Sequence, residues 1–325
     1  MNKTMLAILK VLDKQPDTII GSRELSRQLK MHGIELTERT VRYHLRILDE
    51  RGLTKVFGKE GRKITQKGKE ELSQALVSDK VGFIISKIET LSYLTDLDLE
   101  KNEGNIILNV SYFPEEKLRE ALKIMKHVFL SPYVMCDRVA MQKAGGKIGD
   151  VIVPEGQIGF GTVCSVTING IFLKAGIPVK SRFGGVLQIE NSELSRFIAL
   201  IGYEGSSLDP LEIFIKSRMT DVLGAVKNHS GKILASFREI PVVSLKKARQ
   251  LSEDLKKKGI DGILIIGNPN QPLIEMPVAV DKAGMVIVGG LNPIAALEEA
   301  GIPTVSKAMS TLYSFSNLIQ FKELL

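Results

Sequence analysis

The chain has little cysteine, few aromatic residues and no long hydrophobic run. Cys136 and Cys164 are its only cysteines among 325 residues. Two thiols provide no disulfide framework and no cysteine-based zinc cluster, which fits a reducing cytoplasm. No run of about 18 apolar residues occurs, and the N-terminal stretch lacks the small-residue cleavage site of a secretory signal. We therefore expect a soluble cytoplasmic protein with no membrane partner.

Signatures of catalysis and of metal binding are also sparse. The four histidines are scattered, and none lies at metal-ligand spacing from another: His32, His44, His127 and His229. The sequence has no Walker loop and no strand-linked GxGxxG motif. Cys164 has no neighbouring base, so a small buried cysteine is favoured over a nucleophile. We expect no enzyme, no cofactor and no metal.

The basic excess of the chain is concentrated in its first quarter. The whole chain has a net charge of +7. Residues 1–78 hold 16 lysines and arginines against 10 acids, which leaves +6, whereas the remaining residues hold 28 against 27. This distribution indicates a small module that binds a polyanion, followed by an almost neutral body.

The segment from Leu36 to Leu53 predicts one short helix with a basic outer face. Thr37 is a suitable N-cap and Gly52 ends the helix. Three apolar residues recur at i, i+4 and i+7 and therefore face inward: Val41, Leu45 and Leu48. Arginine side chains on the opposite face could reach guanine edges and phosphates in a DNA groove.

The neighbouring segments predict a winged helix-turn-helix around this basic helix. A helix over Thr4–Asp13 and a helix capped by Ser22 and ending at Gly33 precede it, and a hairpin with a Gly-bounded basic turn follows. In this fold the third helix reads the major groove, and the hairpin can touch phosphate or the minor groove. The predicted DNA-binding residues are Arg39, Thr40, Arg42, Tyr43, Arg46, Lys59, Arg62 and Lys63.

Simpler interpretations of the basic helix remain open at this point. A charged helix face is often only solvated surface, and some winged helices contact proteins rather than DNA. The basic hairpin favours double-stranded DNA. A linker helix is expected over Lys67–Ala75, which places the domains at 1–78 and 79–325.

The second domain contains an internal duplication. Gly104 and Gly231 each open a strand that leads through a proline to an amphipathic helix, at an offset of 231 − 104 = 127. Gly161 and Gly284 are 123 apart, and the two AGIP strings, which begin at residues 175 and 300, are 125 apart. The fold class expected is an α/β regulatory domain built from two similar half-units. Residues 179–226 have no obvious partner and are interpreted as an insertion that packs against the core.

Each half-unit places a hydrophobic strand before a loop and a helix. Asn169 and Asn292 are expected to be N-caps, with Pro293 at the first helical position. We call the place where the strand, the loop and the start of the helix meet a corner. The free backbone amides of a corner favour a phosphate or a carboxylate, so two corners could close on one small anion, with Lys180 or Arg182 as counter-charge. The same residues could instead be structural. The predicted effector-binding residues are Thr162, Cys164, Ser165, Thr167, Asn169, Arg182, Gly289, Gly290 and Asn292.

Several strings together resemble the NrpR family of archaeal repressors of nitrogen-assimilation genes. They are LTERTVRYHLRILDERG, GRKIT, VGFIISKIE, VPEGQIGFGTVCSVTINGIFLKAGIPV, FGGVLQIE and GSSLDPLEIFI. The resemblance covers nearly the whole chain. It implies a dimeric repressor that binds palindromic operators and is released from DNA by the effector 2-oxoglutarate.

The resemblance also raises a question about partners. Some family members carry two regulatory domains in tandem or divide them between two polypeptides, whereas this chain has one. It could act as a homodimer or with a second polypeptide that carries a regulatory domain. A different class of function is that the large domain is a protein-docking co-regulator or an enzyme.

Overall fold

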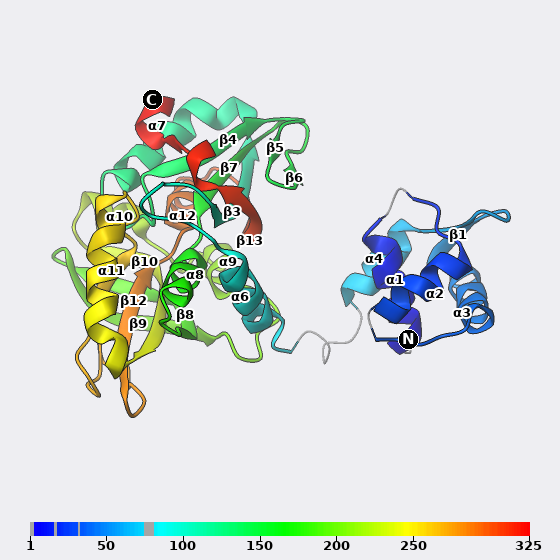
Figure 1. The fold of residues 1–325 in the computed structure, drawn as a ribbon. Helices are drawn as coiled ribbons and strands as arrows, with labels where there is room; N and C mark the ends of the chain where they lie inside the picture. Colours follow the sequence, from blue (N-terminus) through cyan, green and yellow to red (C-terminus); the bar gives the residue numbers. More distant parts are fainter. Residues whose placement is uncertain (1–2, 16–17, 32, 75–80) are drawn as a thin grey trace. The chain divides into compact units, whose positions relative to one another are not determined.

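The computed structural model describes residues 3–15, 18–31, 33–74 and 81–325 (Figure 1). Its contacts divide the chain into two compact units, residues 1–80 and 81–325. The predicted boundary at residues 78 and 79 lies outside the described residues, as does Ala75, the expected end of the linker helix. The boundary therefore stays a prediction. Within the described part of the chain, no helix is long and apolar enough to cross a membrane.

The first unit is a winged helix-turn-helix, as predicted. Its elements are α1 (Lys3–Asp13), α2 (Ser22–Met31), α3 (Glu38–Glu50), β1 (Thr54–Phe57), β2 (Gly61–Ile64) and α4 (Gln66–Gln74). Val41, Leu45 and Leu48 of α3 are fully buried in its core. The side chain of Thr37 accepts a hydrogen bond from the Thr40 amide, which confirms the predicted N-cap.

One predicted cap in this unit was wrong. Ser22 is the first residue of α2 rather than the residue before it. Its hydroxyl donates to Glu38 at 3.0 Å, so it links α2 to the start of α3. The Gly21 carbonyl accepts from the Leu25 amide at 2.9 Å and closes the first turn.

The second unit contains two five-stranded antiparallel sheets (Figure 1). The first sheet has the order β13-β3-β7-β4-β14, and the second has the order β11-β12-β10-β8-β9. The strands of the first sheet are β3 (Asn105–Pro114), β4 (Arg138–Lys143), β7 (Gln157–Val163), β13 (Val305–Ser314) and β14 (Ile319–Gln320). Those of the second are β8 (Lys180–Glu190), β9 (Glu193–Gly202), β10 (Gly231–Pro241), β11 (Ile263–Ile266) and β12 (Lys282–Val288).

Helices pack between and around these sheets, and one continuous core joins both. They are α6 (Phe83–Leu94), α7 (Leu118–Phe129), α8 (Val166–Lys174), α9 (Pro210–Lys216), α10 (Val222–Lys227), α11 (Leu245–Lys257) and α12 (Asn292–Glu299). The short elements are η1 (Glu115–Lys117), β5 (Lys147–Ile148), β6 (Val151–Ile152), η2 (Val242–Ser244), η3 (Phe315–Asn317) and η4 (Phe321–Leu324).

The predicted duplication is confirmed, but the two half-units exchange strands. The first half runs β3, α7, β4, β7, α8 and β8, and the second runs β10, α11, β11, β12, α12 and β13. The last strand of each half joins the other half's sheet, because β8 pairs with β10 and β13 pairs with β3. Residues 179–226 were therefore wrongly interpreted as wholly an insertion. Their first strand, β8, corresponds to β13, and only the part from β9 onward lacks a counterpart.

Hydrogen bonds at the corners repeat the same symmetry. Thr167 Oγ1 accepts from the Ile107 amide at 3.1 Å and donates to its carbonyl at 3.3 Å. In the other half, Asn292 accepts from the Leu234 amide at 2.8 Å, and its Nδ2 lies 3.3 Å from the Leu234 carbonyl. Each corner is thus tied to the first strand of its own half-unit, β3 in one half and β10 in the other.

Candidate functional site

The exposed face of α3 presents the side chains predicted to contact DNA. Arg39, Arg42 and Tyr43 are exposed, with 62% of the Arg42 side chain accessible. Arg46 is 72% accessible, and Thr40 at the start of the helix is half-buried. A helix with this surface can enter the major groove.

Two of these arginines have partners within α3. Arg42 lies 3.3 Å from Glu38, and Arg46 lies 3.5 Å from Glu50. Exposed pairs at i and i+4 stabilise a helix by only about 0.3–0.5 kcal/mol. A phosphate or a guanine edge can therefore displace these carboxylates.

The wing is formed by β1 and β2, and it places its three predicted cations differently. Lys59 lies exposed in the turn between the strands. Lys63 is half-buried, with its Nζ 5.6 Å from the centre of the Phe57 ring. Arg62 is not at the tip, because its Nε donates to Asp49 of α3 at 2.9 Å and only 20% of its side chain is accessible. It joins the wing to the recognition helix, and Lys59 is the cation at the turn. DNA contact by each of these residues stays a prediction.

In the second unit, the two corners meet as expected. A Cβ added at Gly290 would come within 2.7 Å of Asn109 Nδ2, and a Cβ at Gly289 within 2.6 Å of the Leu234 side chain. The glycines thus allow two segments of this chain to approach each other closely. Residues of both corners, including Cys164, Ser165 and Gly290, line a cavity of about 10 Å³. This volume suffices for about one water molecule.

Arg238 of β10 is bonded to Ser165, one of the residues that line this cavity, and was missed in the sequence. It is fully buried, and one guanidinium nitrogen donates to the Ser165 carbonyl at 2.8 Å and also to Asn169 Oδ1. The other donates to Ser165 Oγ at 2.9 Å. Within the described chain, its Nε has no hydrogen-bond partner and no carboxylate lies within ion-pair distance. A buried cation without a counter-ion is costly.

The signal that could have revealed Arg238 is its place in ILASFREIPV. A charged residue inside a run that otherwise predicts a buried strand needs buried partners. At the repeat offset of 127, its counterpart in the first half is Ser111, a neutral residue. The two halves therefore differ in charge at this position.

The two cations predicted as counter-charges are already paired. Arg182 donates to Glu239 at 2.8 Å, and Lys180 lies 3.8 Å from Glu204. Lys180, Asn169 and Glu239 line a separate pocket of about 410 Å³. That pocket also contains Glu89, Glu204 and Lys282, so its acids outnumber its lysines and it does not favour an anion.

The predicted N-caps at the corners were wrong. Asn169 is the fourth residue of α8, where it accepts from Arg238 and donates to Ser181 at 3.0 Å. Asn292 begins α12 but bonds to Leu234 and to the Tyr133 carbonyl rather than to its own helix. Pro293 does lie in the first turn.

The remaining predicted effector residues are buried. Thr162 pairs with Asn109 across the strands, and its hydroxyl is buried with no hydrogen-bond partner in the described structure. Burial raises the pKa of the Cys164 thiol to about 11. This thiol is therefore protonated near neutral pH and does not act as a nucleophile.

Asp209 beside the small cavity predicts a pH dependence of stability. Its pKa is raised to about 6, mainly by burial and further by repulsion from Glu212. The folded chain therefore keeps a proton that the unfolded chain has lost above its ordinary pKa of 3.8. The contribution of Asp209 to the free energy of unfolding therefore falls as the pH rises from 3.8 to about 6, by at most about 3 kcal/mol.

The Asp209→Asn variant isolates this titration, because asparagine can still cap α9. We expect its melting temperature, relative to that of the unchanged chain, to rise between about pH 4 and pH 7. Thermal unfolding monitored by circular dichroism at several pH values measures this difference. A difference that stays constant with pH would contradict the assignment.

Comparisons with known proteins agree with both units. The family model described as NrpR regulatory domains NRD1 and 2 matches residues 81–320. A model of the ribonuclease R winged-helix domain matches residues 6–72. A crystal structure of a nitrogen repressor-like protein from Methanococcus jannaschii superposes with a TM-score of 0.62 at 33% identity and covers 73% of this chain and 97% of that one.

Relatives also match this chain over nearly its whole length. The global nitrogen regulator NrpRI of Methanosarcina mazei is 36% identical over 98% of both chains. The global nitrogen regulator NrpR of Methanococcus maripaludis is 32% identical over 96% of this chain but only 54% of its own length. The chain thus spans about half of that longer relative. These matches show that the chain belongs to the NrpR family of nitrogen regulators, which are transcription regulators rather than enzymes.

Proposed function

We propose that this chain represses nitrogen-assimilation genes by binding a palindromic operator as a homodimer, and that 2-oxoglutarate weakens this binding. The exposed arginine face of α3 supports the DNA part of the proposal. Dimeric readers of this type place two recognition helices on half-sites about one helical turn apart, or a multiple of it.

The observation that carries the effector part is the buried Arg238, which lacks a carboxylate partner in the described structure. A carboxylate of 2-oxoglutarate would supply the missing negative charge and accept two parallel hydrogen bonds from the guanidinium group. Ser165 and Asn169 already orient that group. We therefore place the effector at Arg238 rather than at Arg182 or Lys180.

The small size of the cavity lined by Ser165 suggests how ligand binding could affect DNA binding. The cavity lined by Ser165, which Arg238 contacts, has a volume of only about 10 Å³ and does not admit a dicarboxylate, so binding beside Arg238 would require the two corners to separate. Because each corner belongs to a different half-unit, the ligand would favour an altered arrangement of the halves. A ligand shifts such an equilibrium only by its preference for one state.

Titration of operator DNA with and without 2-oxoglutarate tests the whole proposal. Repressor affinity should fall about 5- to 150-fold at saturating ligand, the usual range of coupling between two sites. Fluorescence anisotropy of a labelled operator measures it, and glutarate, the same five-carbon dicarboxylate without the keto group, is the matched control ligand. DNA binding that 2-oxoglutarate leaves unchanged would refute the effector, whereas no operator binding at all would refute the repressor.

A second candidate is co-regulation with another polypeptide that carries a regulatory domain. The observation in its favour is that the chain spans about half of two relatives, 54% and 56% of their lengths. If 2-oxoglutarate acts only when such a polypeptide is added, this alternative replaces the homodimer.

A further inference from the structure

The outer edge of the second sheet is open, although the matching edge of the first sheet is covered. β11 pairs with β12 on one side, and in the described structure no strand pairs with its other side. It consists of four large aliphatic residues, Ile263, Leu264, Ile265 and Ile266. Proteins normally protect such an edge, because its unpaired amides and carbonyls can bind another chain.

The chain covers the equivalent edge with its own C-terminal segment. β14 pairs with β4 in antiparallel register, with Ile319 opposite Val139 and Gln320 opposite Arg138. The Phe321 amide then donates to the Asp137 carbonyl at 2.9 Å. The Phe321 ring stacks on Phe129 of α7 with centroids 4.0 Å apart. An extended strand with an apolar anchor thus fills the groove between α7 and β4.

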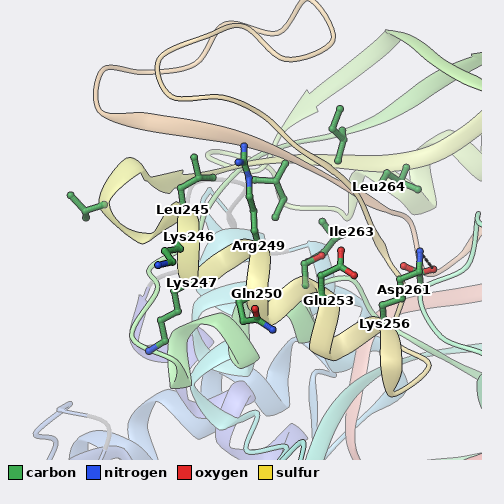
Figure 2. Close-up of a pocket in the computed structure, with 14 residues that line it drawn as sticks. Leu245, Lys246, Lys247, Arg249, Gln250, Glu253, Lys256, Asp261, Ile263 and Leu264 are labelled. Atoms are coloured by element: carbon green, nitrogen blue, oxygen red, sulfur yellow. Dashed lines mark ion pairs between the residues drawn. The ribbon is translucent and has the colours of Figure 1, made fainter.

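The groove between α11 and β11 has the same position in the other half-unit but is open. It has a volume of about 1080 Å³. Figure 2 shows its two walls, with Leu245 and Arg249 on the helix and Ile263 on the strand side. Ile265 is 38% exposed and Val243 is 96% exposed. The groove therefore combines a free strand edge with accessible aliphatic side chains.

The charge of the lining indicates what fits the groove. Four cations line it, Lys246, Lys247, Arg249 and Lys256, against the two acids Glu253 and Asp261. One acid is neutralised, because Asp261 pairs with Lys256 at 3.3 Å. A second copy docked through the same groove would bring two basic helices together, and like charges oppose that contact. An acidic segment would be attracted.

We propose that the groove between α11 and β11 binds an extended acidic and apolar segment of a partner protein, which adds to β11 as an antiparallel strand. Main-chain hydrogen bonds to the strand edge would provide affinity. Alternate aliphatic side chains of the segment would pack on the groove, while its acidic residues face Lys246 and Arg249. Neither α3 nor Arg238 contributes to the lining of this groove, so the proposal does not depend on the proposed function.

The experiment uses the full chain and fluorescein-labelled peptides in which aspartate alternates with isoleucine. We expect saturable binding by fluorescence anisotropy, and weakening of about tenfold or more in the Ile265→Lys variant, because a lysine protects the strand edge. A peptide with lysine in place of aspartate should not bind. A peptide with alternate backbone amides methylated should also fail, because it cannot pair with a strand.

Ile198→Lys is the matched control variant. Ile198 lies on β9, the opposite edge strand of the same sheet, and is 41% exposed. This variant should bind the acidic peptide like the unchanged chain. Hydrogen exchange should show that the peptide protects the amides of residues 263–266.

Three results would overturn the proposal. The first is failure of the acidic peptide to bind the unchanged chain. The second is equal weakening by Ile265→Lys and Ile198→Lys. The third is self-association of the unchanged chain that is lost in the Ile265→Lys variant, measured by analytical ultracentrifugation, together with no binding of the peptide. The groove would then be an interface between two copies of the chain. Operator affinity measured in parallel should be unchanged in Ile265→Lys.

Discussion

Replacing Arg42 with alanine is expected to weaken operator binding by about 1–3 kcal/mol, roughly 5- to 150-fold. Arg42 lies on the exposed face of α3, and its only ion pair in the described structure is the exposed one with Glu38. Its side chain can therefore leave Glu38 and donate two hydrogen bonds to a guanine edge. The Arg46→Ala variant should show a loss of the same kind.

Base specificity separates this role from general attraction to phosphate. If Arg42 reads a guanine, the variant should bind operators with a changed base at that position as well as it binds the original. Arg196→Ala removes an exposed arginine from β9 in the other unit and serves as the control. Gel-shift affinities that are unchanged in both the Arg42 and the Arg46 variants would rule out this face as the DNA reader.

Replacing Arg238 with glutamine is expected to abolish the response to 2-oxoglutarate while operator binding without ligand is kept. Glutamine removes the buried cation that would pair with the carboxylate but keeps an amide donor for the Ser165 and Asn169 oxygens that Arg238 now contacts. The fall in operator affinity that 2-oxoglutarate causes in the unchanged chain, about 5- to 150-fold, should be absent from this variant. Operator titration with and without ligand measures it directly.

Two further variants separate this effect from damage to the fold. Arg238→Lys keeps the charge and should retain part of the response, although a lysine cannot donate in a bidentate fork. Arg182→Gln removes a cation already paired with Glu239 and should leave the response intact. A response that disappears with Arg182→Gln but persists with Arg238→Gln would move the effector to the site first predicted from the sequence. Circular dichroism spectra show whether each variant is folded.

The winged helix was predictable because local rules decide it. The spacing of Val41, Leu45 and Leu48 fixes which side of α3 is buried, and the cap at Thr37 fixes where the helix begins. The turn glycines fix the hairpin. The pairing of Arg62 with Asp49 could not be predicted in the same way, because the two residues come together only when the wing folds back on α3.

The sequence by itself determined the basic recognition helix, the wing and the duplicated body, because charge, periodicity and repeat spacing are local properties of the chain. Only the tertiary structure decided that the halves exchange β8 and β13, since strand pairing depends on which edges are free after the helices pack. It also decided that Arg182 is paired with Glu239, whereas Arg238 has no counter-ion among the described residues. Burial and ion pairing depend on which residues are neighbours in space, and Arg182 and Arg238 come from strands of different halves.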